Sequence, residues 1–129
     1  MFQIALIHKD HAAREILARA LHRRLHSMVT DYSCIEDLML TELHYDVFVV
    51  YKDLGHHLNG VQGVKLIREK KPDALIIGVS NMPNTDREFL PAGANAFLLR
   101  SGNEVEELQE LILKKIAQWV NTPPRPQGE

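Results

Sequence analysis

The stretch Tyr45-Asp46-Val47-Phe48-Val49-Val50-Tyr51-Lys52-Asp53 decides the fold. Its centre, residues 47–50, is four consecutive apolar residues, three of them β-branched. A run that is apolar at every position is typical of a strand buried on both faces in a parallel α/β sheet. In such sheets the functional residues lie where the chain leaves the carboxyl end of a strand. Tyr51 occupies that exit, so it is the first candidate functional residue.

The rest of the chain alternates between short apolar runs and segments with helical periodicity. The pattern predicts strands over residues 2–7, 28–32, 47–50, 74–79 and 95–99, and helices over 11–25, 33–43, 60–71 and 103–121. The segment 83–91 predicts only a turn or two of helix, because Pro91 ends it. Five strands, each followed by a helix, predict an α/β fold: a doubly wound, five-stranded parallel sheet of the flavodoxin-like (βα)5 type, strand order 2-1-3-4-5, in three layers.

The same strand order predicts a site. The first and third strands are neighbours in it, so His8, Lys9, Asp10 and Tyr51 are expected in one crevice. The fourth and fifth strands follow, which adds Ser80 and Arg100 beside the crevice.

Composition narrows the class of protein. The chain has 129 residues, 45% of them hydrophobic and 25% charged, with a formal charge of −2, as expected for one globular domain without a nucleic-acid or membrane partner. The lone Cys34 excludes an internal disulfide, and neither a signal peptide nor a membrane-spanning run is evident, so a cytoplasmic location is expected. We expect one domain over residues 1–121, with the Pro-rich residues 122–129 as a tail or linker.

The order of these segments resembles the receiver domain of bacterial response regulators over roughly residues 2 to 120. The stretches that carry the resemblance are Ile4-Ala5-Leu6-Ile7-His8-Lys9-Asp10, Asp46-Val47-Phe48-Val49-Val50-Tyr51, Gly63-Val64-Lys65-Leu66-Ile67-Arg68, Ala74-Leu75-Ile76-Ile77-Gly78-Val79-Ser80, Gly93-Ala94-Asn95-Ala96-Phe97-Leu98-Leu99-Arg100 and the last amphipathic helix. The resemblance implies a signalling domain of two-component systems.

The residues that define activity in that family mostly differ here. The aspartate that accepts a phosphoryl group is replaced by Tyr51, which cannot form an acyl phosphate. The two acidic residues that hold Mg²⁺ correspond to His8 and Lys9, which leaves Asp10 as the nearby carboxylate. The lysine that contacts the phosphoryl oxygens corresponds to Arg100. The Thr or Ser station and the aromatic station are kept as Ser80 and Phe97.

Phosphoryl transfer needs an oxygen nucleophile and a hard cation held by oxygen ligands. His8, Lys9 and Arg100 predict instead a cationic crevice, opposed by Asp10, that repels Mg²⁺. We therefore predict a degenerate pseudo-receiver that is not an enzyme and uses no cofactor. Lys9 or Arg100 is expected to pair with Asp10 or with the Tyr51 hydroxyl.

Such a domain would act by binding a protein partner, or a second copy as a homodimer. The resemblance places the interaction face on residues 83–91, 95–99 and 103–118, with the candidates Ser80, Met82, Phe89, Leu90 and Phe97. The short 83–91 segment differs from the longer helix of the family, which implies a changed partner.

Two other functions stay open at this point. The domain is a phosphorylatable receiver if a displaced Asp53 or Asp10 accepts the phosphoryl group, although the strand register predicts that Asp53 lies past the crevice in a solvated turn. An unrelated α/β enzyme or flavin-binding domain is the other class. Against it, His8-Lys9-Asp10-His11 stands where a phosphate loop would follow the first strand, and no Gly-x-Gly-x-x-Gly or Gly-x-Ser-x-Gly occurs.

Four histidines form one further pattern. His8 and His11 follow the first strand, and His56 and His57 lie in the long loop after the third. Imidazoles suit Zn²⁺, Ni²⁺ or Cu²⁺. The spacing is not that of a ligand motif, and solvated surface residues explain it more simply, so no metal is expected.

Overall fold

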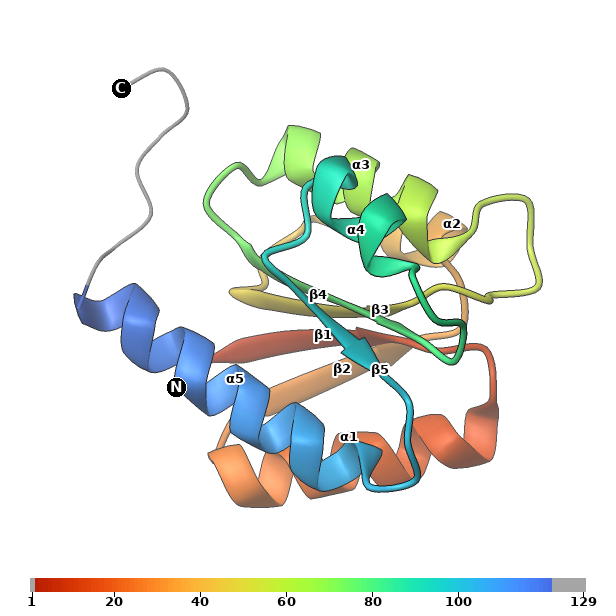
Figure 1. Ribbon diagram of the computed structural model, residues 1–129. Helices are drawn as coiled ribbons and strands as arrows, with labels where there is room; N and C mark the ends of the chain where they lie inside the picture. The colour runs from red at the N-terminus through yellow and green to blue at the C-terminus, as the bar shows by residue number, and fades with distance from the viewer. Residues whose placement is uncertain (1, 122–129) are drawn as a thin grey trace.

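The apolar runs form five parallel strands, which pair in the order β2-β1-β3-β4-β5 (Figure 1). The computed structural model describes residues 2–121, so the predicted tail 122–129 lies outside the described residues. The strands are β1 (Gln3–Ile7), β2 (Met28–Tyr32), β3 (Val47–Tyr51), β4 (Leu75–Ser80) and β5 (Ala96–Leu99). Strand order and fold class are confirmed.

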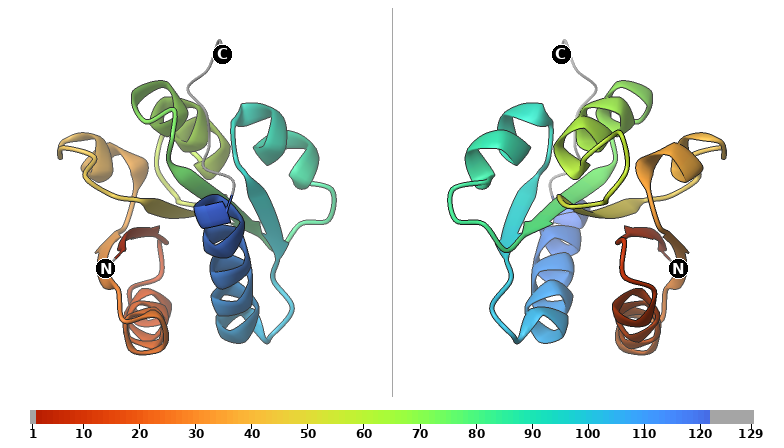
Figure 2. Two further views of the ribbon diagram at one scale, coloured as in Figure 1. Left: turned by 90° about the vertical axis from the view of Figure 1, so that its left-hand side faces the viewer. Right: turned by 90° about the vertical axis from the view of Figure 1, so that its right-hand side faces the viewer.

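Helices cover both faces of the sheet. They are α1 (His11–Leu25), α2 (Ile35–Met39), α3 (Gly60–Lys70), α4 (Asp86–Ala92) and α5 (Glu104–Asn121). Figure 2 shows α1 and α5 on one face of the sheet and α2, α3 and α4 on the other, which gives the three predicted layers. Among the described residues, no helix has the length and apolar character needed to cross a bilayer.

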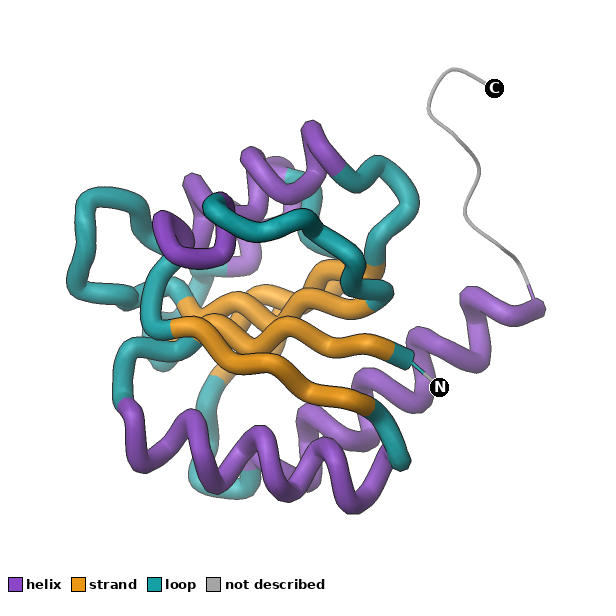
Figure 3. Tube along the Cα trace, turned by 180° about the vertical axis from the view of Figure 1, so that it is seen from behind, coloured by secondary structure: helices purple, strands orange, loops and turns teal. Residues whose placement is uncertain are grey.

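The core lies along β3 and β4. Every residue of these two strands is buried, as the apolar runs 47–50 and 75–79 predict. β2 is an edge strand with exposed positions. Figure 3 shows the sheet enclosed between the two helical layers.

The helix ends follow from local sequence. The Asp10 side chain caps α1 by accepting from the backbone N–H groups of Ala12 and Ala13. Asn59 and Gln62 form a capping box at the start of α3. α2 is shorter than the predicted 33–43, because the backbone N–H of Thr41 turns back to the carbonyl of Leu38 and ends the helix. α4 ends at Ala92 and holds Pro91 in its last turn.

Two glycines bring helices close to the sheet near its carboxyl edge. A Cβ on Gly60 would lie 2.2 Å from the carbonyl oxygen of Tyr51, so α3 starts directly against the end of β3. A Cβ on Gly78 would lie 2.4 Å from the ring of Phe89, which therefore packs directly against the backbone of β4. These contacts set the positions of α3 and α4 around the strand ends.

Candidate functional site

Polar side chains follow four strands at the carboxyl end of the sheet. Ile7 of β1 pairs with Val50 of β3, so His8 and Tyr51 leave neighbouring strands at the same level. Ser80 of β4 pairs with Leu99 of β5, and Arg100 follows it. The strand ends and their loops border a cavity of about 420 Å³, which is lined by His8, Lys9, Lys52, Asp53, Asn59, Val79, Ser80, Asn81, Met82 and Arg100.

Tyr51 lies beside this cavity and is almost fully buried, with 3% of its surface exposed. Its ring contacts the His8 imidazole, with 4.1 Å between the ring centroids. Its hydroxyl donates a hydrogen bond to Oε2 of Glu104. Burial raises the pKa of the Tyr51 phenol far above its ordinary value, and the Glu104 carboxylate raises it further. The phenol therefore stays protonated and acts as a hydrogen-bond donor.

Glu104, the first residue of α5, connects Tyr51 to Arg100. Its Oε1 accepts from Nε of Arg100 at 3.1 Å, while Oε2 accepts from Tyr51. The Arg100 guanidinium carbon lies 5.7 Å from the centroid of the Tyr51 ring, within range of a cation–π contact. The expectation that Lys9 or Arg100 pairs with the Tyr51 hydroxyl is therefore wrong. The partner is Glu104, whose signal in the sequence was its four-residue spacing from Arg100.

His8 is buried and neutral. Its Nδ1 accepts the backbone N–H of Asp10 at 3.0 Å, so the ring proton belongs on Nε2. Nε2 is itself buried and has no hydrogen-bond partner in the described structure. Burial lowers the pKa of His8, and the nearby Arg100 lowers it further. His8 therefore does not supply the positive charge expected from the sequence.

Lys9 pairs with Asp53 rather than with Asp10. Its Nζ lies 2.7 Å from Oδ2 of Asp53, and both side chains are largely exposed. The prediction that Asp53 lies past the crevice is wrong, because Asp53 lines the cavity. The ammonium of Lys9 lowers the pKa of the Asp53 carboxyl. This pair joins the loop after β1 to the loop after β3.

Asp10 turns toward α1 and is absent from the cavity lining. Its Oδ1 accepts from Ala12 and Ala13 at 3.0 and 3.2 Å, and these bonds, Ala13 first, lower the pKa of its carboxyl. The expected ion pair of Asp10 with Lys9 or Arg100 is therefore wrong, because Lys9 pairs with Asp53 and Arg100 with Glu104. Its geometry is that of a helix cap.

The charges around the cavity are balanced, which corrects the expectation of a cationic crevice. Lys9 pairs with Asp53, Arg100 with Glu104, and Lys52 with Glu88 at 2.9 Å. Lys9–Asp53 joins the loops after β1 and β3, and Lys52–Glu88 joins the loop after β3 to α4. Arg100–Glu104 spans four residues where α5 begins.

Ser80 lies at the end of β4 and is nearly buried. Its Oγ accepts from the backbone N–H of Met82 at 3.0 Å, and the hydroxyl of Thr85 donates to the Met82 carbonyl at 2.6 Å. These two bonds fix the turn between β4 and α4. Ser80 thus stabilises the turn through its hydroxyl oxygen and also lines the cavity.

The candidates for the interaction face separate into two groups. Phe89 is fully buried and stacks near the half-buried Phe97, with 5.9 Å between the ring centroids, so its assignment to an exposed face is wrong. Phe89 lies in α4, which is only seven residues long, so its sequence periodicity does not show which side faces the sheet. Met82 and Leu90 are exposed by 59% and 45%. Leu99 on β5 and Leu113 on α5 are exposed as well.

The four histidines do not form one cluster. His8 is buried with Nδ1 occupied, whereas His11 is exposed beside Arg14 and Glu15. Within the described residues, His56 lies with Cys34 and Glu36, a group that contains neither His8 nor His11. The grouping weighed from the sequence is therefore wrong.

Solved structures that superpose on this chain include receiver domains of response regulators. The BeF3-activated receiver domain of DrrB, a response regulator of Thermotoga maritima, superposes with a TM-score of 0.81 at 19% identity, over 91% of this chain and 98% of that one. TrrA from Thermotoga maritima, in complex with Mg²⁺ and BeF, superposes with a TM-score of 0.78 at 22% identity, over 88% of this chain and 98% of that one. A two-component response regulator from Clostridium difficile superposes with a TM-score of 0.79 at 18% identity, over 95% of this chain and 100% of that one.

At these low identities the superpositions show the fold alone. The chemistry of the site has to be inferred from its own residues. No family model matches the sequence, and no curated protein matches it either. The chain has the receiver fold, with its own set of side chains at the carboxyl edge.

Proposed function

We propose that this chain, which has the receiver fold of response regulators, is a pseudo-receiver: a cytoplasmic domain of two-component-type signalling that binds a protein partner without being phosphorylated. The proposal rests on the partly buried hydrogen bond between Tyr51 and Glu104. Tyr51 ends β3, the position from which the resemblance expects an acceptor aspartate. A buried phenol with a raised pKa is a poor nucleophile and cannot form an acyl phosphate.

The donor atoms after β1 support the same conclusion. Mg²⁺ prefers carboxylate and carbonyl oxygens in a near-octahedral arrangement. The two positions that follow β1 carry the imidazole of His8 and the ammonium of Lys9, and the next carboxylate, Asp10, caps α1. This set of side chains does not fit Mg²⁺. No step of the proposed function uses a metal or another cofactor.

The contacts of Glu104 suggest how the domain keeps one conformation without phosphate. Glu104 begins α5, accepts from Tyr51 at the end of β3, and accepts from Arg100 after β5. One carboxylate thus joins three elements of the fold. We propose that this connection replaces the contacts that a phosphoryl group would make, so that the partner meets a constant surface.

The proposed partner surface is the edge of the sheet at β5 with its flanking helices α4 and α5. Within residues 2–121, β5 pairs with β4 alone. Met82, Leu90, Leu99 and Leu113 expose apolar side chains on these elements or beside them. Exposed apolar side chains on these elements favour a protein partner, and a second copy of the chain would give a homodimer. With a net charge of −2, a nucleic-acid or membrane partner is disfavoured.

The surface is tested with matched charge insertions. Leu90→Asp and Leu113→Asp place a carboxylate on the proposed face, whereas Leu40→Asp does so at a leucine exposed by 86% at the end of α2. Self-association is followed by sedimentation velocity, and partner binding by affinity capture from the source cell. Loss in the first two variants alone supports the surface. Loss in all three, or in none, contradicts it.

A second candidate, a phosphorylatable receiver, has one observation in its favour. Asp53 lines the cavity, its side chain is 77% exposed, and the side chains of Lys9, Lys52 and Arg100 line the cavity with it. Those are groups that a phosphoryl oxygen would meet. If the protein gains a phosphoryl group, Asp53→Asn removes the gain when Asp53 is the acceptor, and Asp10→Asn does so when Asp10 is.

A further inference from the structure

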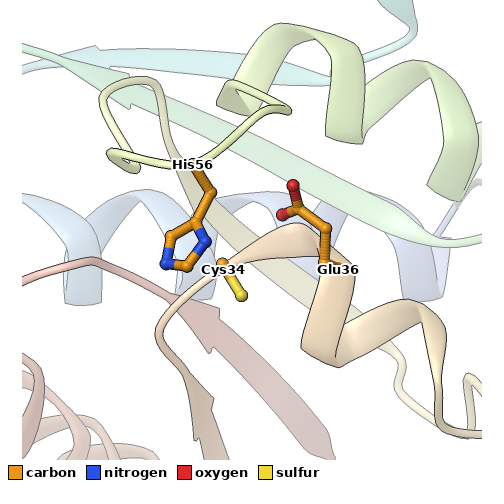
Figure 4. A group of neighbouring side chains, drawn as sticks. All are labelled: Cys34, Glu36 and His56. Atoms are coloured by element: carbon orange, nitrogen blue, oxygen red, sulfur yellow. The ribbon is translucent and has the colours of Figure 1, made fainter.

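Two segments that are distant in sequence bring three metal-binding side chains together. Cys34 is the N-cap residue of α2 and Glu36 lies in its first turn, whereas His56 belongs to the loop between β3 and α3. The Cys34 sulfur, a Glu36 carboxylate oxygen and a His56 ring nitrogen all lie within 4.8 Å of one another. Figure 4 shows His56 reaching from its loop toward the two side chains at the start of α2.

Glu36 carries an unused oxygen at this place. Its Oε2 accepts from the backbone N–H of Leu58 at 3.1 Å, which leaves Oε1. Oε1 is buried and has no hydrogen-bond partner in the described structure. Buried polar atoms are almost always paired, and a buried carboxylate oxygen without a donor points to a cation or donor that completes it.

Cys34 is similarly available. It is 2% exposed and free, and its side chain makes no capping hydrogen bond to α2. A thiol among apolar residues needs no partner, but here a carboxylate and an imidazole lie beside it. Sulfur, imidazole nitrogen and carboxylate oxygen are together the ligand set of Zn²⁺ sites, and sulfur is not a ligand of Mg²⁺ or Ca²⁺.

We propose that Cys34, Glu36 and His56 bind a divalent transition-metal cation, with Zn²⁺ as the best match. The thiolate and the carboxylate supply two negative charges that balance the ion, and a fourth position stays open to water. Ordinary Zn²⁺ bond lengths place ligand atoms roughly 3.3–3.7 Å apart in a tetrahedral site. Because the three atoms lie within 4.8 Å of one another, they need to approach by about 1.5 Å at most. The exposed His56, on a loop, is the ligand that moves.

The ion would fix the loop over residues 52–59, which also carries Asp53 of the cavity. Glu36 already holds this loop through Leu58, and the cation would add a second connection at His56. The inference does not depend on the proposed function, because none of the three ligands lines the cavity.

The site is tested with Co²⁺ as an optical probe and Zn²⁺ as competitor, on the untagged full chain kept reduced. Co²⁺ is expected to bind one ion per chain, with a thiolate-to-cobalt charge-transfer band and the intense visible bands of tetrahedral cobalt. Added Zn²⁺ abolishes both. His56→Ala weakens binding at least about 100-fold, since even loss of an outer-shell partner weakens metal sites 10–100-fold. His57→Ala, the matched neighbour, changes it less than about threefold.

Cys34→Ser removes the charge-transfer band. Because Cys34 is buried, that variant is checked for folding by circular dichroism, and the exposed His56 provides the decisive variant. The proposal is overturned if cobalt gives no thiolate band. It is also overturned if His56→Ala and His57→Ala weaken binding equally, which would indicate chance chelation by the loop.

Discussion

The hydroxyl of Tyr51 donates a hydrogen bond to the carboxylate of Glu104, which lies 53 positions further along the chain. Through this bond the end of β3 contacts the first turn of α5 at the carboxyl end of the sheet. Arg100 completes the contact from the other side of the carboxylate. The position is thus occupied by a structural interaction, and this underlies the predictions that follow.

The Tyr51–Glu104 bond should stabilise the fold. Tyr51→Phe removes the donor and leaves the ring in place, and we expect a loss of about 1–2 kcal/mol in the free energy of unfolding, measured by urea denaturation. Glu104→Gln should cost a similar amount, and the double variant should lose less than the sum. Glu106→Gln, in the same turn but exposed, should be close to neutral. Additive losses would show that the two side chains are not coupled.

The buried His8 should make stability depend on pH. Its pKa is lowered in the folded state, so the unfolded chain binds a proton first as the pH falls. The stabilisation is complete above the ordinary histidine pKa of about 6.5 and is lost as the pH falls through the lower folded value. When unfolding is measured from pH 8 to pH 5, the urea concentration at the midpoint should decrease once the pH is below about 6.5. His8→Phe should flatten that decline, whereas His11→Phe, at an exposed histidine, should keep it.

Gly78 should be intolerant of a methyl group. A Cβ at this position would lie 2.4 Å from the Phe89 ring, which is fully buried. Gly78→Ala should therefore destabilise the protein by about 1–3 kcal/mol, as overpacked cores do. Combining it with Phe89→Leu should recover part of that loss in thermal unfolding, since the smaller side chain frees space. A double variant less stable than Gly78→Ala alone would mean that the clash is relieved in another way.

Arg68 should be required for stability, because its guanidinium connects three backbone segments. Its guanidinium donates to the carbonyls of Gly93, Lys71 and Ala74 at 2.8–3.1 Å, which joins α3 to the start of β4 and the end of α4. An ammonium cannot reproduce this planar set of bonds. Arg68→Lys should cost about 2–3 kcal/mol in chemical denaturation, and the exposed Arg87→Lys close to nothing. Equal effects would contradict a structural role for Arg68.

Sequence reasoning predicts this fold well because the strands carry strong signals. Residues 47–50 of β3 and 75–79 of β4 are apolar without a break, and both strands are buried at every residue. The alternation of strands and helices then leaves few topologies, and the observed order is the predicted one. His8, Lys9, Ser80 and Arg100 meet at one cavity because parallel strands end at the same edge.

The partners of these residues could not be predicted in the same way. Asp53 meets Lys9 because of the path of the loop after β3, which no local pattern encodes. Glu104 meets Tyr51 only once α5 packs on the sheet. Phe89 belongs to a helix of seven residues, too short for a periodic signal. Its one clue was Gly78, a glycine in the middle of an apolar strand, which indicates a large side chain packed close to the backbone.

Incubation with acetyl phosphate and Mg²⁺, followed by intact-mass spectrometry, tests most directly whether the phosphorylation chemistry is lost. An active receiver domain in the same reaction provides the positive control. We predict that the mass of this chain stays unchanged while the control gains a phosphoryl group, because Tyr51 stands at the end of β3, where the resemblance implies the acceptor, and is held by Glu104. A gain of one phosphoryl group by this chain, removed by Asp53→Asn or Asp10→Asn, would contradict the pseudo-receiver and identify the acceptor.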